Sequence, residues 1–308
     1  MTAEHGALPA SGGVIHDIGY RRYTGQRLGR PAIIRALVWH SLRSSVGIGR
    51  GAKAKIIPVI VFVVMCLPAV ANAVAVAQGG HRLVPYDTYL FGLRVLVLII
   101  FIAAQAPELV SRDLRSHVLP LYFCRPLRRL DYPLAKLAAF VLACLALIEI
   151  PLLLLYLGTI AQAHGAGAIW DQTKALIPGL LVGVLWAVLL AAIGLALASL
   201  SGRRAYATGS IAIYFFLSWI LAGLLDTIGG GRGPLTGGAG PAAAGARLSG
   251  LVSPFTTVDG VRQWLGGTSR GPIPPPGSYG PLYGVMFLLL LAGALGLLAA
   301  RYRKADLT

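Results

Sequence analysis

ELVSRDLRSHVLPLYFCRPLRRLDYPLAK, residues Glu108–Lys136, is a charged segment with an apolar run on each side. The runs Val95–Pro107 and Leu134–Gln162 contain very few charged side chains. A helix needs about 20 mostly apolar residues to cross a bilayer. The segment therefore predicts a connection between two membrane-spanning helices. The first span is short unless Leu90–Arg94 joins it, with Arg94 reaching toward the interface.

The composition of the whole chain indicates a membrane protein. Of its 308 residues, 56% are hydrophobic and 12% are charged, and the mean hydropathy is +0.73. Soluble domains contain about 25% charged residues. Six stretches are apolar over roughly the length of a span: Ile56–Ala77, Val95–Pro107, Leu134–Gln162, Ala175–Leu200, Tyr206–Leu225 and Leu282–Ala300.

The predicted fold class is an all-α integral membrane protein with six transmembrane helices. An N-terminal interfacial amphipathic helix and short extracellular helices before the last span complete it. We divide the chain into a cytoplasmic tail (1–55), a transmembrane domain (56–300) and a second cytoplasmic tail (301–308). The transmembrane domain includes a cytoplasmic loop at 108–133 and an extracellular loop at 226–281.

The distribution of basic residues predicts the orientation. The formal net charge is +16, and the basic residues are concentrated in the two tails and in alternate connections. The short connections 79–89 and 163–174 contain only one arginine, Arg82, and one lysine, Lys174. Because basic residues are retained on the cytoplasmic side, both termini are expected in the cytoplasm of a multi-pass protein in the plasma membrane. This placement favours membrane lipids over nucleic acid as the partner of the positive charge.

Residues Pro31–Arg50 predict a helix that lies along the membrane surface. Its apolar residues gather on one side of a helical projection, and its basic residues lie opposite. Trp39 suits the border between water and lipid. A solvated helix packed on another subunit is the alternative.

The outer loop before the last span predicts a short helix that starts at Ser253. Ser253 can cap it, and Pro254 suits its first position. Apolar and polar side chains then fall on different faces: Phe255, Val258, Val261, Trp264 and Leu265 against Asp259, Arg262 and Gln263. This is the candidate extracellular gate helix.

The charged segment itself predicts a helix over Glu108–Leu119. Glu108 and Arg112 are four residues apart in the order that favours an ion pair, and Asp113 and His117 repeat the spacing. Val110, Leu114 and Val118 form an apolar row. From the residues alone, a helix that contacts a partner and a solvated loop that only sets the topology are equally supported.

The same segment resembles the loop after the second span in permeases of ABC-2 type ABC transporters. The family pattern is matched at ten positions: Glu108, Ser111, Arg112, Asp113, Leu119, Leu121, Pro126, Arg129, Tyr132 and Lys136. His117-Val118 replaces the usual Gly-Thr. The order of tail, interfacial helix, six spans and outer helix resembles the family in outline.

The resemblance implies a transport subunit of an ATP-driven exporter, with no enzymatic activity of its own. Two permease subunits, alike or sister chains, would pair with two copies of a separate ATPase, which binds ATP and Mg. The loop helix would seat in the ATPase through Glu108, Ser111, Arg112, Asp113, Leu114 and Arg115, and Arg203 and Arg204 would form the second cytoplasmic loop. The cargo would be lipophilic or amphipathic, such as a drug, a lipid or a peptide.

No nucleotide-binding motif is found in the sequence itself. The Gly-rich run 47–53 lacks the spacing of a phosphate loop and a Ser or Thr after Lys53. The chain is therefore expected to hold no cofactor. No metal site is expected either, because Cys66, Cys124 and Cys144 lack the spacing of metal ligands.

Polar residues inside the spans are the remaining candidates. A carboxylate near the centre of a membrane helix costs roughly 2.5–3.5 kcal/mol, so Glu149 should face protein or a water-filled path. Two interpretations of Glu149 remain open: it lines the cargo path, or it has a structural role and bonds to a neighbouring helix or across the subunit. Asn72 and Gln105 are interpreted as hydrogen-bond partners between helices. The competing classes are a membrane enzyme that uses intramembrane acids and a passive channel.

The charge distribution leads to a test of topology. In a background without the native cysteines, Ser269→Cys should react with an impermeant thiol reagent in intact cells, and Ser201→Cys should not. Labelling of Ser201→Cys alone would reverse the predicted orientation.

Overall fold

The computed structural model describes residues 25, 28–78, 86, 89, 93–116, 122, 127–163, 165–230, 244–267 and 275–304. Within these residues the regular structure is helical, and no strand is present. The elements are α1 (Arg30–Ser45), α2 (Ala52–Ala77), α3 (Leu93–Leu109), α4 (Ser111–Arg115), α6 (Asp131–Ile160), α7 (Ala166–Ser199), α8 (Arg204–Ile228), α9 (Ala244–Ser249), α10 (Pro254–Trp264), the short 3-10 helix η2 (Gly277–Tyr279) and α11 (Gly280–Lys304).

Six of the described helices are long and apolar enough to cross a membrane, as the sequence predicted. They are α2, α3 together with α4, α6, α7, α8 and α11. The chain is therefore a multi-pass helical membrane protein. The expected connection at 163–174 is wrong in extent, because α7 already begins at Ala166. Lys174 lies over the ring of Trp170 and near Asp171, so polar side chains contact one another in the second and third turns of α7.

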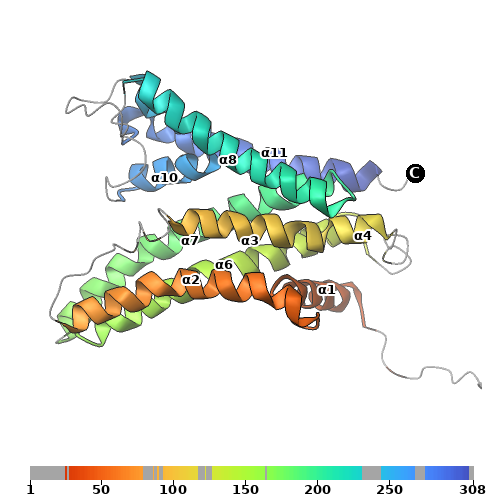
Figure 1. Ribbon diagram of the computed structural model, residues 1–308, viewed down its shortest axis with the longest axis horizontal. Helices are drawn as coiled ribbons and strands as arrows, with labels where there is room; N and C mark the ends of the chain where they lie inside the picture. The colour runs from red at the N-terminus through yellow and green to blue at the C-terminus, as the bar shows by residue number, and fades with distance from the viewer. Residues whose placement is uncertain are drawn as a thin grey trace, which may run out of the picture.

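The helices are arranged with α3 and α7 at the centre of the bundle. In Figure 1, α8, α10 and α11 lie on one side of α3, and α1, α2 and α6 lie on the other. Helix α7 packs against both groups, through α6 and through α11. The two central helices are the most buried of the six candidate spans. One end of the bundle holds α1, α4 and the end of α11, and we call it the α4 end; the opposite end holds α10 (Figure 1).

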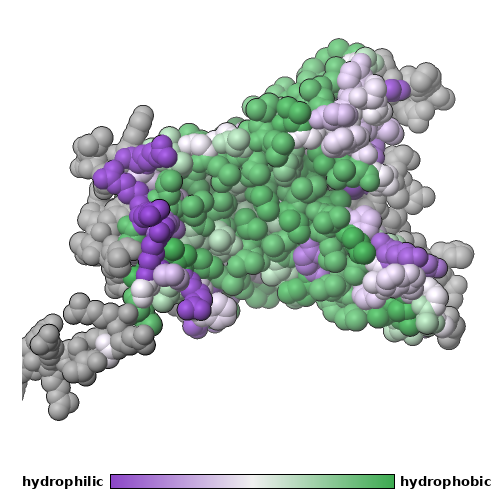
Figure 2. All heavy atoms as spheres, turned by 180° about the vertical axis from the view of Figure 1, so that it is seen from behind, coloured by the Kyte–Doolittle hydropathy of each residue, from purple (hydrophilic) through white to green (hydrophobic). Residues whose placement is uncertain are grey.

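The surface of the molecule has the hydropathy of a membrane protein. Figure 2 shows mostly apolar residues across the middle of the visible face and hydrophilic residues toward both ends. Many large apolar side chains of α2, α8 and α11 are exposed in the single chain. Such an exposed apolar surface is stable only against lipid or another protein chain.

Helix α10 forms where the sequence predicted, but its environment differs from the prediction. It begins at Pro254, whereas the Ser253 side chain makes no capping hydrogen bond. The polar side of the predicted amphipathic helix is also buried at Asp259 and Arg262, which are 0% and 2% exposed. They form an ion pair of 2.7 Å within the helix. Phe255 and Val258 join the main apolar core together with Trp186 of α7 and Phe215 of α8.

Close contact between the central helices depends on a glycine. A Cβ atom built on Gly194 of α7 would lie 2.5 Å from Cγ2 of Ile102, a fully buried residue of α3. Glycine therefore lets the backbone of α7 approach α3, as small residues do between membrane helices.

We expect Gly194→Ala to destabilise the chain by about 1–3 kcal/mol, because Ile102 has no free space to move into. Gly209→Ala is the matched control, since a Cβ atom there meets nothing within 4 Å and alanine favours a helix. Thermal unfolding in detergent compares the two variants. Equal unfolding midpoints would contradict the proposed close contact.

Candidate functional site

The helix predicted over Glu108–Leu119 is interrupted in the structure. Helix α3 ends at Leu109, Val110 has non-helical dihedral angles of −121° and −53°, and α4 then runs over Ser111–Arg115. The Ser111 hydroxyl donates a hydrogen bond of 2.9 Å to the backbone carbonyl of Ala198 in α7. This bond holds the start of α4 on α7. Residues 117–121 lie outside the described part, so the predicted Asp113–His117 pair stays a prediction.

Glu108 joins three segments that are distant in the sequence. Its carboxylate accepts a hydrogen bond of 2.5 Å from Nη2 of Arg50, in the turn between α1 and α2. It also pairs with Arg204, the first residue of α8. The Glu108 side chain is only 8% exposed. The predicted pair with Arg112 is wrong, since both ion-pair partners of Glu108 among the described residues come from other segments.

Asp113 is held on the first turns of α6. The hydroxyl of Tyr132 donates to it at 2.5 Å, and Nζ of Lys136 lies 2.9 Å from the same carboxylate oxygen. Tyr132 also packs against Tyr302 near the end of α11, with ring centroids 5.4 Å apart. The short helix α4 is thus fixed to α6 by a carboxylate and to α7 by Ser111.

The apolar row of the charged segment faces the protein itself. Val110 is 1% exposed, and Leu114 packs against the main core. The chain itself therefore covers Val110 completely and Leu114 in part. Val118 is not among the described residues. The exposed side chains of α4 and the residue after it are Arg112, Arg115 and Ser116.

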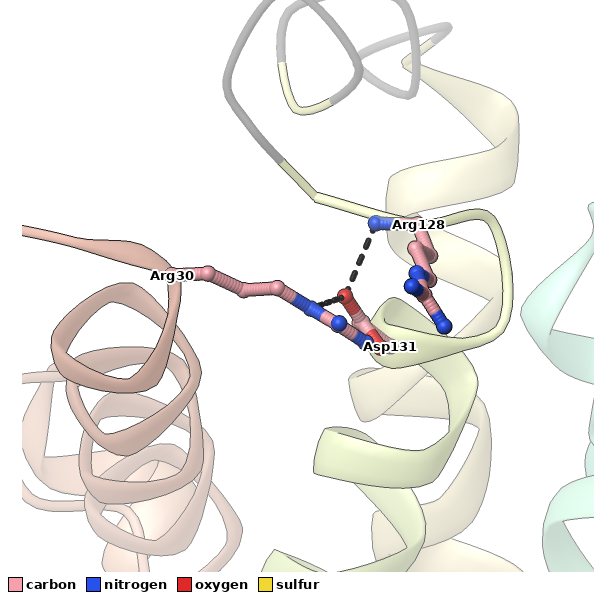
Figure 3. A network of polar contacts seen from close by, with 3 residues as sticks. All are labelled: Arg30, Arg128 and Asp131. Atoms are coloured by element: carbon pink, nitrogen blue, oxygen red, sulfur yellow. Dashed lines mark hydrogen bonds and ion pairs between the residues drawn. The ribbon is translucent and has the colours of Figure 1, made fainter.

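A further ion pair attaches α1 to the start of α6 (Figure 3). Nε and Nη2 of Arg30 donate hydrogen bonds of 2.7 and 2.5 Å to the two carboxylate oxygens of Asp131. The backbone N–H of Arg128 donates to Asp131 at 2.8 Å. The hydrogen bond from Arg30 to Asp131 raises the pKa of the guanidinium. The N-terminal end of α1 is therefore fixed by a two-pronged contact with defined geometry.

A cavity of about 1110 Å³ lies between α1, the turn after it, α4 and the first turns of α6. Trp39, His40 and Arg43 of α1 line one side, and Arg112 and Asp113 of α4 line another. Helix α1 therefore packs against the bundle with one face and forms a wall of the cavity with another. Leu37, Ser41 and Ser45 are buried on one of its faces, and Trp39, His40 and Arg43 are exposed on another.

The remaining candidate residues lie in two other places. Asn72, Gln105 and Glu149 are inside the bundle, and the residues of α10 are at the opposite end (Figure 1). The two oxygens of Glu149 are buried and have no hydrogen-bond partner among the described residues. A Cβ atom on Gly183 of α7 would collide with one of them, so the carboxyl group occupies the space left by a glycine. Glu149 therefore sits between α6 and α7.

Several residues that build the α4 end were not singled out from the sequence. Arg50 was part of a Gly-rich run, Arg30 was one basic residue among many, and Asp131 was a charged residue at a span boundary. Tyr132 and Lys136 matched the family pattern, but no role was assigned to them. No periodic pattern connects Arg50 with Glu108, because 58 residues separate them.

Comparison with known proteins does not assign a family to the chain. No protein-family model matches it, and no significant match is found among curated proteins. The class is therefore stated from the structure alone, as a multi-pass helical membrane protein with an ion-paired α4 end.

The pairing of Glu108 predicts a large effect of removing its charge. Glu108→Gln should destabilise the chain by about 1–3 kcal/mol, because the partly buried Arg50 loses its carboxylate. Asp171→Asn is the control, since its carboxylate is 77% exposed and 3.8 Å from Lys174, and such pairs contribute little. Thermal unfolding in detergent measures both variants. The same midpoint in the two would contradict a structural role for the Glu108 pairs.

Proposed function

We propose that the chain is the permease subunit of an ATP-driven exporter of the ABC-2 type. The observation that carries the proposal is the ion-paired α4 end, where Glu108 links the α1–α2 turn, the end of α3 and the start of α8. The resemblance would place these segments in the cytoplasm and would seat the loop helix that follows α3 in the ATPase. A transport subunit driven from outside the membrane needs a rigid contact surface of this kind.

The connections of α4 favour transmission of a movement into the bundle. Ser111 bonds to α7, Asp113 bonds to α6, and the adjoining Glu108 bonds to α8. A force on α4 would therefore act on these helices together, as in rigid-body switching. A solvated loop with the same charges would absorb the displacement without moving the helices.

Of the two exposed basic side chains of α4, Arg115 is the proposed contact with the ATPase, whereas Arg112 lines the cavity. Gly202, in the connection between α7 and α8, lies beside the backbone of Arg115. Arg203, which follows it, is also exposed and lies over the ring of Tyr206. ATP and Mg would bind to the partner chain. Glu108, Ser111, Asp113 and Leu114 would position α4, because their contacts are made within the chain.

The surface of the bundle suits assembly with a second permease subunit. Helices α2, α8 and α11 expose large apolar side chains in the single chain, and lipid or a second copy would cover them. A cargo path between two such subunits suits a lipophilic or amphipathic substrate. Glu149 contributes there as a pathway residue or as a contact between α6 and α7.

The proposal is tested by capture of the ATPase. Arg115→Glu reverses an exposed charge that has no ion-pair partner among the described residues, so it should leave folding intact and weaken binding of an acidic partner surface. We expect a loss of about tenfold or more in co-purified ATPase and less transport per ATP hydrolysed. Arg203→Ala should have a smaller effect.

Arg35→Glu is the matched control, because Arg35 is exposed on α1 and lies outside both α4 and the cavity. Leu114→Asp is a poor probe, since Leu114 packs in the core. Mass spectrometry of proteins that co-purify with the wild-type chain identifies the ATPase. Absence of any ATPase, or full capture and normal coupling in Arg115→Glu, would reject the proposal.

A further inference from the structure

The cavity at the α4 end contains more positive charge than the described part of the chain neutralises. Six charged side chains line it: Arg43, Arg50, Arg112, Lys136, Glu108 and Asp113. Both carboxylates are already paired with basic side chains. Arg43 and Arg112 form no ion pair with any residue in the described part of the chain. Two arginines from different helices that line the cavity, Arg43 of α1 and Arg112 of α4, are thus available to an external anion.

The rim of the cavity has the composition of a membrane interface. Trp39 is 60% exposed and Ile48 is 49% exposed, and both line the cavity next to the basic groups. Tryptophan and basic side chains together are typical of the head-group region of a bilayer. Trp39 and the arginines would also suit a protein interface, so the choice of a lipid rests on the apolar groove beside the cavity.

An apolar groove lies on the other side of the turn between α1 and α2. Its volume is about 270 Å³, and its described lining is apolar, including Val46, Pro58, Phe62, Phe101, Leu147 and Ile150. The turn contributes Val46 to this groove and Ile48–Gly51 to the cavity. It folds closely onto α2, because a Cβ atom on Gly47 would lie 2.8 Å from the carbonyl oxygen of Ala54. A polar and an apolar recess are therefore separated by one short turn.

We propose that this pair of recesses binds one anionic phospholipid. Its phosphate lies between Arg43 and Arg112, whose planar guanidinium groups suit phosphate oxygens. Its acyl chain enters the apolar groove. The cavity volume of about 1110 Å³ is that of a site for a large ligand, so it accommodates a complete head group and not only a free ion. Basic pockets beside membrane helices bind anionic head groups in this way.

The test uses the purified full-length chain in mild detergent, without any ATPase. Dioctanoyl phosphatidylglycerol, dioctanoyl phosphatidylcholine and inorganic phosphate are titrated separately, and binding is followed by native mass spectrometry and by thermal unfolding. We expect phosphatidylglycerol to bind most tightly. Arg43→Gln and Arg112→Gln should each weaken this binding about tenfold or more, because each removes a charged hydrogen-bond donor.

Matched variants separate the head-group contact from general charge. Arg35→Gln on α1 and Arg115→Gln on α4 remove exposed charges outside the cavity and should leave the affinity unchanged. Ala146→Leu partly fills the apolar groove and should weaken binding of phosphatidylglycerol but not of inorganic phosphate. Unfolding of the unliganded variants shows which of them remain folded.

Three results would overturn the proposal. Binding of phosphatidylglycerol that is equal in all variants would indicate nonspecific lipid around the bundle. Inorganic phosphate that binds as tightly as phosphatidylglycerol, with no effect of Ala146→Leu, would indicate a site for a free anion. Failure of phosphatidylglycerol to bind the folded wild-type chain would reject the lipid site. None of the binding measurements depends on the transport function proposed above.

Discussion

The buried carboxylate of Glu108 is the contact on which the α4 end depends. A charge that is largely removed from water must be paired, because an uncompensated buried charge is strongly destabilising. Glu108 meets this requirement with arginines from the turn before α2 and from the start of α8. Three segments that are far apart in the sequence are thereby held together. Two further ion pairs, Asp113–Lys136 and Arg30–Asp131, fix α4 and α1 to the start of α6.

The same pairing explains why basic charge remains at this end. The described acidic side chains at the α4 end are Glu108, Asp113 and Asp131, and each already has a basic partner. Arg43, Arg112 and Arg115 are exposed to the surroundings. These arginines attract anions outside the chain, whether the anions belong to lipid head groups or to another protein. The cavity between α1 and α4 distinguishes these arginines by position, because Arg43 and Arg112 line it and Arg115 does not.

In the described part of the chain, buried acidic side chains away from the α4 end do not pair with distant segments. The Asp259–Arg262 pair lies within one helix and is almost completely buried between α7, α8 and α11. Two opposite charges three residues apart can neutralise each other before the helix packs, so α10 can be buried as a unit. Glu149 has no such neighbour and instead occupies the space that Gly183 leaves on α7. Inside the bundle, Asp259 is thus paired with a residue of its own helix, whereas Glu149 fits into space that a glycine leaves free.

The sequence by itself determined the helical membrane class, the six candidate spans and the start of α10, because these follow from apolar runs and from Pro254 at a helix start. The sequence also located the charged segment at the end of α3. Only the tertiary structure decided which charges pair, since Glu108 meets Arg50 and Arg204 rather than its neighbour Arg112. It also decided that Val110 and Leu114 face the core and that Asp259 and Arg262 are buried. Hydropathy depends on each residue's own side chain, whereas pairing and burial depend on which distant segments the folded backbone brings together.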